Sequence, residues 1–302
     1  MYHRSLAKYA WLAIAAAVTT MAMKVVASWM TGSVSLLSDA LESGVNLLAA
    51  VLALVALRAA DGDPNDNFAY GKAKAEYLSA GIEGTMIVVA AIAILITAVP
   101  RLISPTEIER AGIGVVISLV AGAINLGVAV ALTRAGRRYR SIALEADGKH
   151  LMTDVWSSVG VGVGVILVAV TGWTRLDPIV AILVAIHIVV SGLFLMKRSV
   201  YGLLDARIPN DDLDRLHAIL DRHRSAALEF HAVMTRQAGQ RAFMSFHVLV
   251  PGSRTITSAH NQVEAIEAEL RAAVPHLHVV THIEPLEDPR SFTDLGLERV
   301  DP

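Results

Sequence analysis

The feature that most constrains this chain is the density of apolar residues between positions 10 and 200. Long runs of Ala, Val, Ile and Leu are interrupted there only by short polar gaps. About 20 helical residues cross the hydrocarbon core of a bilayer. The sequence therefore predicts six membrane-spanning helices, at positions 9–31, 34–58, 78–101, 112–133, 143–171 and 178–197.

Composition narrows the class of protein further. The 302 residues are 54% hydrophobic and 18% charged, with a net charge of -2 and no Cys. Soluble domains carry about 25% charged residues. These values exclude a disordered chain, a disulfide scaffold and a nucleic-acid-binding protein. Without Cys, any metal site must use nitrogen and oxygen ligands. The first apolar run continues past Lys24 without a clear cleavage site, so we expect a retained helix rather than a signal peptide.

The sequence changes character near residue 206, and most of the His residues follow that point. We predict a transmembrane domain at 1–205, a cytoplasmic regulatory domain at 206–290 and a tail at 291–302. Helical spacing and alternation predict an α-β-β-α-β order in the second domain. This order indicates an open α/β sheet with helices on one face. The expected elements lie at 211–223, 227–236, 241–251, 258–273 and 278–285.

The distribution of Lys and Arg predicts the orientation, because cytoplasmic loops are enriched in both. One set of loop ends carries Arg101, Arg110 and Arg175. The other set carries many more cations, so we expect that side and both termini to be cytoplasmic. We expect the membrane to be the inner (plasma) membrane of a bacterium. Those cations are Arg4, Lys8, Arg58, Lys72, Lys74, Arg134, Arg137, Arg138, Arg140, Lys149, Lys197 and Arg198.

Two pairs of polar residues within the predicted spans have the same spacing. Glu42 and Asn46 lie in the second span, and His150 and Asp154 lie in the fifth. Residues four apart share a helix face. Two such helices packed together would present four ligands to one point, as in the metal sites of helix bundles. Two carboxylates, an imidazole and an amide oxygen suit a divalent cation.

Other polar residues in the spans have simpler interpretations. Serines and Asn125 commonly hydrogen-bond helices together. His187 is alone on an apolar face, where packing is more common than ligation. Lys24 faces the bundle or extends its ammonium to the interface. Glu83 either pairs with Lys24 or joins an ion path, and the sequence leaves both open.

Four segments resemble the signatures of the cation diffusion facilitator family. Gly32–Glu42 is similar to its second-span signature, and Tyr70–Glu76 to its second cytoplasmic loop. His150 and Asp154 match its fifth-span HxxxD motif, and Leu176–Ile179 resembles the start of its sixth span. With six spans and a His-bearing tail, the resemblance covers nearly the whole chain.

The resemblance implies a homodimeric antiporter in the lipid bilayer that exports a divalent transition-metal cation in exchange for protons. It implies a transport site formed by Glu42, Asn46, His150 and Asp154. The family usually has Asp or His where Glu42 stands and Asp where Asn46 stands. Zinc, iron and manganese all remain candidate substrates. A ligand must lose its proton to bind metal, so protons compete at the site, and we expect His150 and Asp154 to couple them.

The resemblance also implies features outside the membrane. It places a cytoplasmic regulatory site, with zinc as a possible occupant, at His231, His247, His260, His282 and Glu284. It implies a charge interlock between Lys74 and Asp205 at the dimer interface. A further family site in the second loop is not expected here, because Lys72 stands at its position.

Two other functions stay open on the sequence alone. A sodium/proton antiporter could use the same carboxylates, and Asn46 makes this possible. A membrane metal sensor would bind a cation without moving it. We do not expect an enzyme, because the sequence has no HExxH zinc motif, Ser/His nucleophile pair or Gly-rich phosphate loop.

Overall fold

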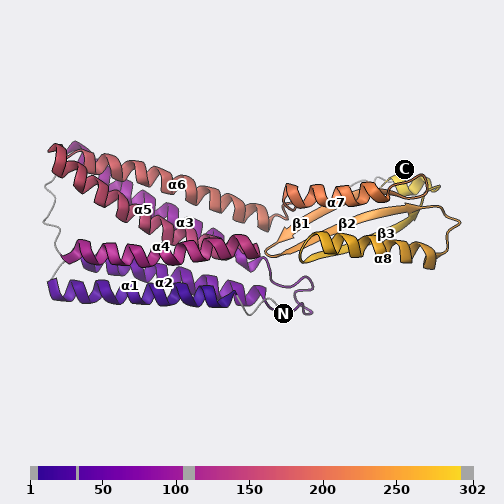
Figure 1. The fold of residues 1–302 in the computed structure, drawn as a ribbon, viewed down its shortest axis with the longest axis horizontal. Coiled ribbons are helices and arrows are strands. Elements are labelled where there is room, and N and C mark those ends of the chain that lie inside the picture. The colour runs from indigo at the N-terminus through magenta and orange to yellow at the C-terminus, as the bar shows by residue number, and fades with distance from the viewer. Residues whose placement is uncertain (1–5, 32–33, 105–112, 294–302) are drawn as a thin grey trace. The chain divides into compact units, whose positions relative to one another are not determined.

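The computed structural model describes residues 6–31, 34–104 and 113–293, without the side chains of 31, 34–42, 113–115, 118, 161–162, 164–165 and 169. The chain divides into two compact units, Met1–Tyr201 and Gly202–Pro302. The first holds long helices, and the second holds a small sheet with two helices (Figure 1). This is the predicted fold class, a helical membrane domain followed by an α/β domain.

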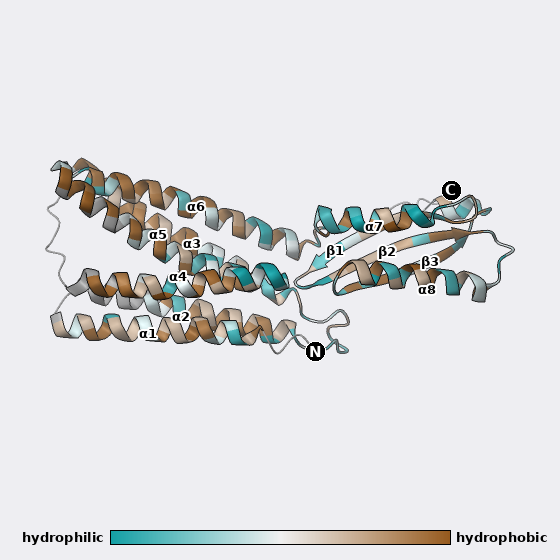
Figure 2. Ribbon diagram, in the orientation of Figure 1, coloured by the Kyte–Doolittle hydropathy of each residue, from teal (hydrophilic) through white to brown (hydrophobic). Residues whose placement is uncertain are grey.

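Long helices make up the first unit: α1 (Ala7–Thr31), α2 (Val34–Ala60), α3 (Ala75–Ile103), α4 (Ile113–Tyr139), α5 (Ile142–Thr171) and α6 (Leu176–Leu203). By length and composition, all except α5 include candidate membrane spans. Helix α5 is equally long, but several side chains in its apolar half lie outside the described part. The outer surfaces are apolar and exposed, as lipid-facing surfaces are, while polar residues gather toward one end of the helices (Figure 2).

The helices extend beyond the apolar runs that predict them. The predicted sixth span ends at 197, whereas α6 continues to Leu203. Similarly, α3 begins at Ala75, before the predicted position 78. Backbone hydrogen bonding continues through polar residues that reach water, so a hydropathy pattern finds the membrane-embedded part of a helix and not its ends.

Helix α5 is central to the first unit. It belongs to two buried clusters, one shared with α1, α2 and α4 and the other with α3 and α6. Its start is fixed by Ser141, whose hydroxyl accepts from the backbone N–H of Leu144, and it ends at Gly172 in the left-handed conformation. Gly148 lets α4 approach closely, because a Cβ there would lie 2.6 Å from Oγ1 of Thr133. Residues facing inward from α5 are therefore held among closely packed helices.

The second unit has the predicted α-β-β-α-β order. Its elements are α7 (Asn210–His223), β1 (Glu229–Ala238), β2 (Arg241–Val250), α8 (Ile256–Ala273) and β3 (Leu277–Pro285), followed by a short 3-10 helix, η2 (Pro289–Phe292). The sheet order is β1-β2-β3, with β1 antiparallel and β3 parallel to β2.

Both helices of this unit pack on one face of the sheet. The alternating residues Ala242, Met244, Phe246, Val248 and Val250 of β2 enter a core with apolar residues of α7 and α8. Residues of β2 between them, including His247, point to the opposite face, because successive strand residues alternate. This alternation places the predicted ligands of the strands, but not His260 of α8, on the face away from the helices.

Candidate metal sites

Three of the four predicted transport ligands meet between α2 and α5. Nδ2 of Asn46 donates a hydrogen bond to Oδ2 of Asp154. The Oδ1 atom of Asn46 lies 2.7 Å from Nε2 of His150. Asn46 and His150 are buried, and Asp154 is half-buried. One amide thus links two groups that lie one turn apart on α5.

The fourth predicted ligand is Glu42. It lies in α2, one turn before Asn46, but its side chain is outside the described part of the structure. Helical spacing places Glu42 and Asn46 on the same face of α2. Its participation in the site stays a prediction.

A half-buried cation on α1 acts on the same site. The ammonium of Lys24 interacts electrostatically with the carboxylate of Asp154. The interpretation of Lys24 as facing the bundle agrees with this interaction. Glu83, the other group considered for Lys24, accepts a hydrogen bond from Ser79 at 3.1 Å and lies near Asp147.

The second candidate site lies on the exposed face of the cytoplasmic sheet. His231, His247 and His282 stand in register across β1, β2 and β3. Glu284 follows two residues after His282 and points to the same face. A β-bulge begins directly after His231, where Ala232 has a φ of 50°. Bulges commonly redirect a side chain beside a functional site.

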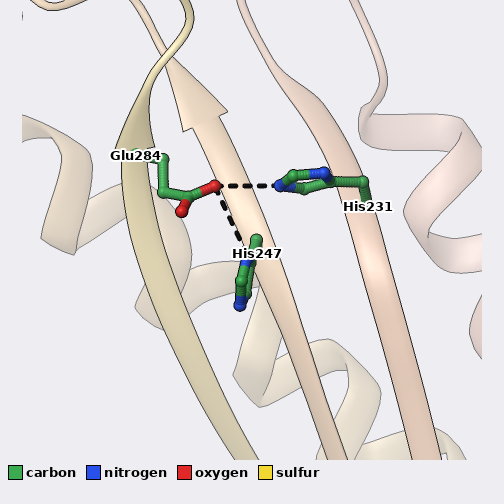
Figure 3. A group of neighbouring side chains, drawn as sticks. All are labelled: His231, His247 and Glu284. Carbon is green, nitrogen blue, oxygen red and sulfur yellow. Dashed lines mark hydrogen bonds and ion pairs between the residues drawn. The ribbon is translucent and has the colours of Figure 1, made fainter. Parts of the chain in front are cut away.

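One carboxylate joins the histidines of this cluster, as Figure 3 shows. The Oε2 atom of Glu284 lies 2.9 Å from Nε2 of His231 and 3.3 Å from Nδ1 of His247. Potential ligand atoms of all three residues lie within 4.8 Å of one another. Imidazole nitrogens and carboxylate oxygens are donors that Zn²⁺ commonly takes. These residues therefore fit a divalent metal ion.

The remaining predicted cytoplasmic ligands lie farther from this centre. The side chain of His282 is 67% exposed, and its Nε2 atom lies 3.6 Å from Oε1 of Glu284. His260 is exposed on α8, which packs on the other face of the sheet. The structure thus brings together His231, His247 and Glu284, with His282 beside them and His260 apart within one chain.

The predicted interlock residues belong to separate units, so their contact stays a prediction. Asp205 follows α6, and its carboxylate accepts a hydrogen bond from Arg236 at 3.0 Å. In the second loop, Lys72 lies over the ring of Phe68. On α6, His187 packs edge-on against Trp156, as expected for a packing role.

The sequence marks Glu83 as a possible member of an ion path, but it does not indicate that Glu83 lies close to Asp147. Glu83 of α3 and Asp147 of α5 are both buried and close enough to repel each other electrostatically. Asp147 lies three residues before His150, and that spacing is the signal that could have linked it to the site. Its partner is on another helix, and no spacing rule connects the two.

The chain matches two family models. Residues 10–204 match the cation efflux transmembrane domain, and residues 208–286 match the cytoplasmic domain of cation efflux proteins. A transporter of Synechocystis that is itself uncharacterized is 45% identical over 94% of this chain and 92% of its own length. The cation-efflux pump FieF of Shewanella oneidensis is 30% identical over 91% of this chain and 92% of its own.

One solved structure is similar to part of this chain. The metal-bound C-terminal domain of the CzcD transporter from Thermotoga maritima is 26% identical, with a TM-score of 0.24, and covers 26% of this chain and 92% of that domain. The family assignment rests on the two family models, which together cover most of the chain, and on the full-length relatives. The chain belongs to the cation diffusion facilitator family of divalent-cation efflux proteins.

Proposed function

We propose that this chain exports a divalent transition-metal cation from the cytoplasm in exchange for protons, through Glu42, Asn46, His150 and Asp154. The observation that carries the proposal is the contact of Asn46 on α2 with both His150 and Asp154 on α5. Family membership supplies divalent-cation efflux. The ligand set, the proton coupling and the metal are the parts we propose.

The chemistry of these groups supports proton exchange. The Nε2 atom of His150 can bind a cation only without its proton, and a carboxylate must be ionised. When no cation is bound, the NH₂ group of the Asn46 amide contacts one neighbour and its carbonyl oxygen contacts the other. An arriving cation competes with those hydrogen bonds and with protons for the same atoms. Imidazole, amide and carboxylate donors suit zinc, manganese and ferrous iron.

We also propose a regulatory metal site, with zinc as its occupant, at His231, His247 and Glu284. Their potential ligand atoms lie within 4.8 Å of one another and come from three different strands. A bound divalent ion would add coordination bonds between β1, β2 and β3. His282 would have to turn toward the other two imidazoles to join, whereas His260 would have to come from a second copy of the chain. If His260 of a second copy completes the site, full coordination of the metal would require the dimer.

The wider organisation is part of the proposal. We place the transmembrane domain at 1–205, the cytoplasmic domain at 206–290 and a tail at 291–302. The chain would act as a homodimer in the bacterial plasma membrane, with both termini in the cytoplasm. The excess of Lys and Arg at one set of loop ends supports this orientation. Lys74 and Asp205 would form their charge interlock at the dimer interface.

Transport by the purified chain in lipid vesicles tests this function against its rivals. Zinc, manganese, ferrous iron, cobalt and cadmium are supplied in turn under one fixed pH gradient. We expect uptake of at least one of these metals, which collapses when the gradient is removed. Stimulation by sodium alone would favour a sodium/proton antiporter. Metal binding without uptake would favour a membrane sensor.

A further inference from the structure

The first unit buries two carboxylates that the proposed transport site does not use. Glu83 of α3 is 0% exposed, and Asp147 of α5 is 1% exposed. The charge of Asp147 acts on Glu83, and that of Asp154 acts on Asp147. Oxygens of both groups are buried without hydrogen-bond partners in the described part of the chain: Oε2 of Glu83 and both carboxylate oxygens of Asp147.

Other buried acids in the same helices have partners. Glu145 accepts a hydrogen bond from Arg198 at 2.6 Å, and Glu76 accepts one from Ser141 at 2.5 Å. For Glu83, the hydroxyl of Ser79 donates to Oε1 and leaves Oε2 free. Burying an unpaired ionised group is costly, and two that repel each other cost more. Within the described part of the chain, the oxygens Oε2 of Glu83, Oδ1 of Asp147 and Oδ2 of Asp147 therefore lack the hydrogen-bond donors that Glu145 and Glu76 have.

The position of the pair relates it to the ion path. Residues 147, 150 and 154 fall on one face of α5, because they are spaced by three and four. At about 1.5 Å of rise per residue, Asp147 lies about one turn from His150. It is nearer the start of α5, the end of the helix that carries the cationic loop residues. A cation entering there would meet Asp147 before the proposed transport site.

Close helix packing holds both carboxylates in place. A Cβ at Gly84, next to Glu83, would lie 3.2 Å from the backbone oxygen of Gly192 on α6. At Gly148, next to Asp147, it would lie 2.9 Å from the backbone nitrogen of Thr133 on α4. These approaches leave little room for the helices to shift. A ligand that neutralises the pair must be small.

We propose that Glu83 and Asp147 form a second subsite for a divalent cation, separate from the Asn46–His150–Asp154 group and on its cytoplasmic side. The subsite rests on the proposed function for its place in the path. Two carboxylates balance the charge of one divalent ion. Together with the hydroxyl of Ser79, the two carboxylates offer only oxygen donors. Oxygen donors suit manganese better than imidazole nitrogens do. Manganese is therefore the probe.

The test counts bound Mn²⁺ per full-length chain in detergent at fixed pH, by electron paramagnetic resonance. The background variant H150A/D154N removes the proposed transport site. Adding E83Q/D147N to this background should lower the count by one ion per chain. The matched control E145Q alters a buried acid of α5 that has a partner, and it should leave the count unchanged. An unchanged count after E83Q/D147N overturns the subsite and indicates carboxylates that are neutralised by protons alone.

Failure of the proposed function would appear in a different comparison. Equal counts of bound Mn²⁺ in the wild type and the background variant would argue against the proposed transport site, whatever the result for E83Q/D147N. Folding is checked by thermal unfolding without metal. Replacing repelling carboxylates by amides of similar shape should leave the melting temperature unchanged or raise it. If the double substitution fails to fold, E83Q and D147N are tested singly in the same background. Each should weaken Mn²⁺ affinity by at least about 10-fold, and wild-type-like affinity in both would refute the proposal.

Discussion

The side chain of Asn46 on α2 meets that of His150 on α5, with Oδ1 of the amide 2.7 Å from Nε2 of the ring. The two residues are 104 positions apart in the sequence. The same amide donates to Asp154, so it joins an imidazole and a carboxylate that lie one turn apart on α5. Because Asn46 contacts both groups, a substitution at position 46 can alter the metal preference of the site with little change in side-chain shape.

The first prediction concerns N46D. The substitution adds a third carboxylate to the proposed ligands and removes the amide donor that satisfies Asp154. We expect zinc affinity to rise, on the order of 10-fold, because the added charge acts in a buried site. We also expect binding to depend more steeply on pH, since one more group must lose its proton. Zinc titrations of the purified chain at several pH values measure both. Unchanged affinity would remove Asn46 from the ligand set.

The second prediction concerns E284Q in the cytoplasmic cluster. Glu284 lies between His231 and His247, so the change removes the charge that both rings share. Metal affinity of this site should fall at least about 10-fold. Calorimetric titration of zinc into the full chain measures the loss. H217A is the control, because it removes an exposed imidazole on α7. Equal effects of the two substitutions would indicate nonspecific binding by surface histidines.

The third prediction concerns the contact between α4 and α5. In G148A, the added methyl group would lie 2.6 Å from Oγ1 of Thr133, so the helices must separate. We expect a loss of about 1–3 kcal/mol, as for overpacked cores, together with weaker transport. In G127A on α4, the methyl group meets nothing within 4 Å, and no loss is expected. Thermal unfolding in detergent compares the variants. A similar loss in both would contradict the close-packing argument.

The fourth prediction concerns acid conditions at η2. Hydrogen bonds from Arg290 lower the pKa of Asp288 from 3.8 to about 2. A lowered pKa stabilises the folded state above pH 4, and this contribution disappears as the pH falls through 2. The ring centroids of Phe292 in η2 and His231 lie 6.2 Å apart, so η2 is next to the His231–His247–Glu284 cluster.

We therefore expect faster amide exchange in η2 as the pH is lowered from 5 to 2, after correction for the intrinsic pH dependence of exchange. D288N should show this looser state already at pH 5, without further change on acidification. Hydrogen–deuterium exchange of the full chain measures the effect. The control is R215A on α7, which leaves the pair of Asp288 and Arg290 intact. A protected η2 in D288N at pH 5 would show that the pair does not hold it.

Spacing in the sequence accounts for much of the fold and for part of the sites. The four-residue spacing of His150 and Asp154 predicts one face of α5, and alternation predicts that His282 and Glu284 share a face of β3. The αββαβ order is confirmed, as is the bundle of long apolar helices. These features depend on local periodicity, which a single sequence contains.

Contacts between distant elements could not be derived in this way. The partner of Glu83 depends on how α3 is rotated against α5, and a single sequence does not fix that rotation. The role of Lys24 beside Asp154 was open for the same reason. In the cytoplasmic domain, alternation identifies residues that share a face. It does not show that His282 is largely exposed while His231 and His247 both reach Glu284.

The central claim is that His150 binds the metal and exchanges protons with it. Uptake into vesicles under a pH gradient tests this in H150A, with H187A as the control because that imidazole is exposed and packs edge-on against Trp156. We expect H150A to lose gradient-driven metal uptake and H187A to retain it, with both variants folded. Gradient-driven uptake that persists in H150A at the wild-type rate would show that His150 is not needed for proton-coupled transport.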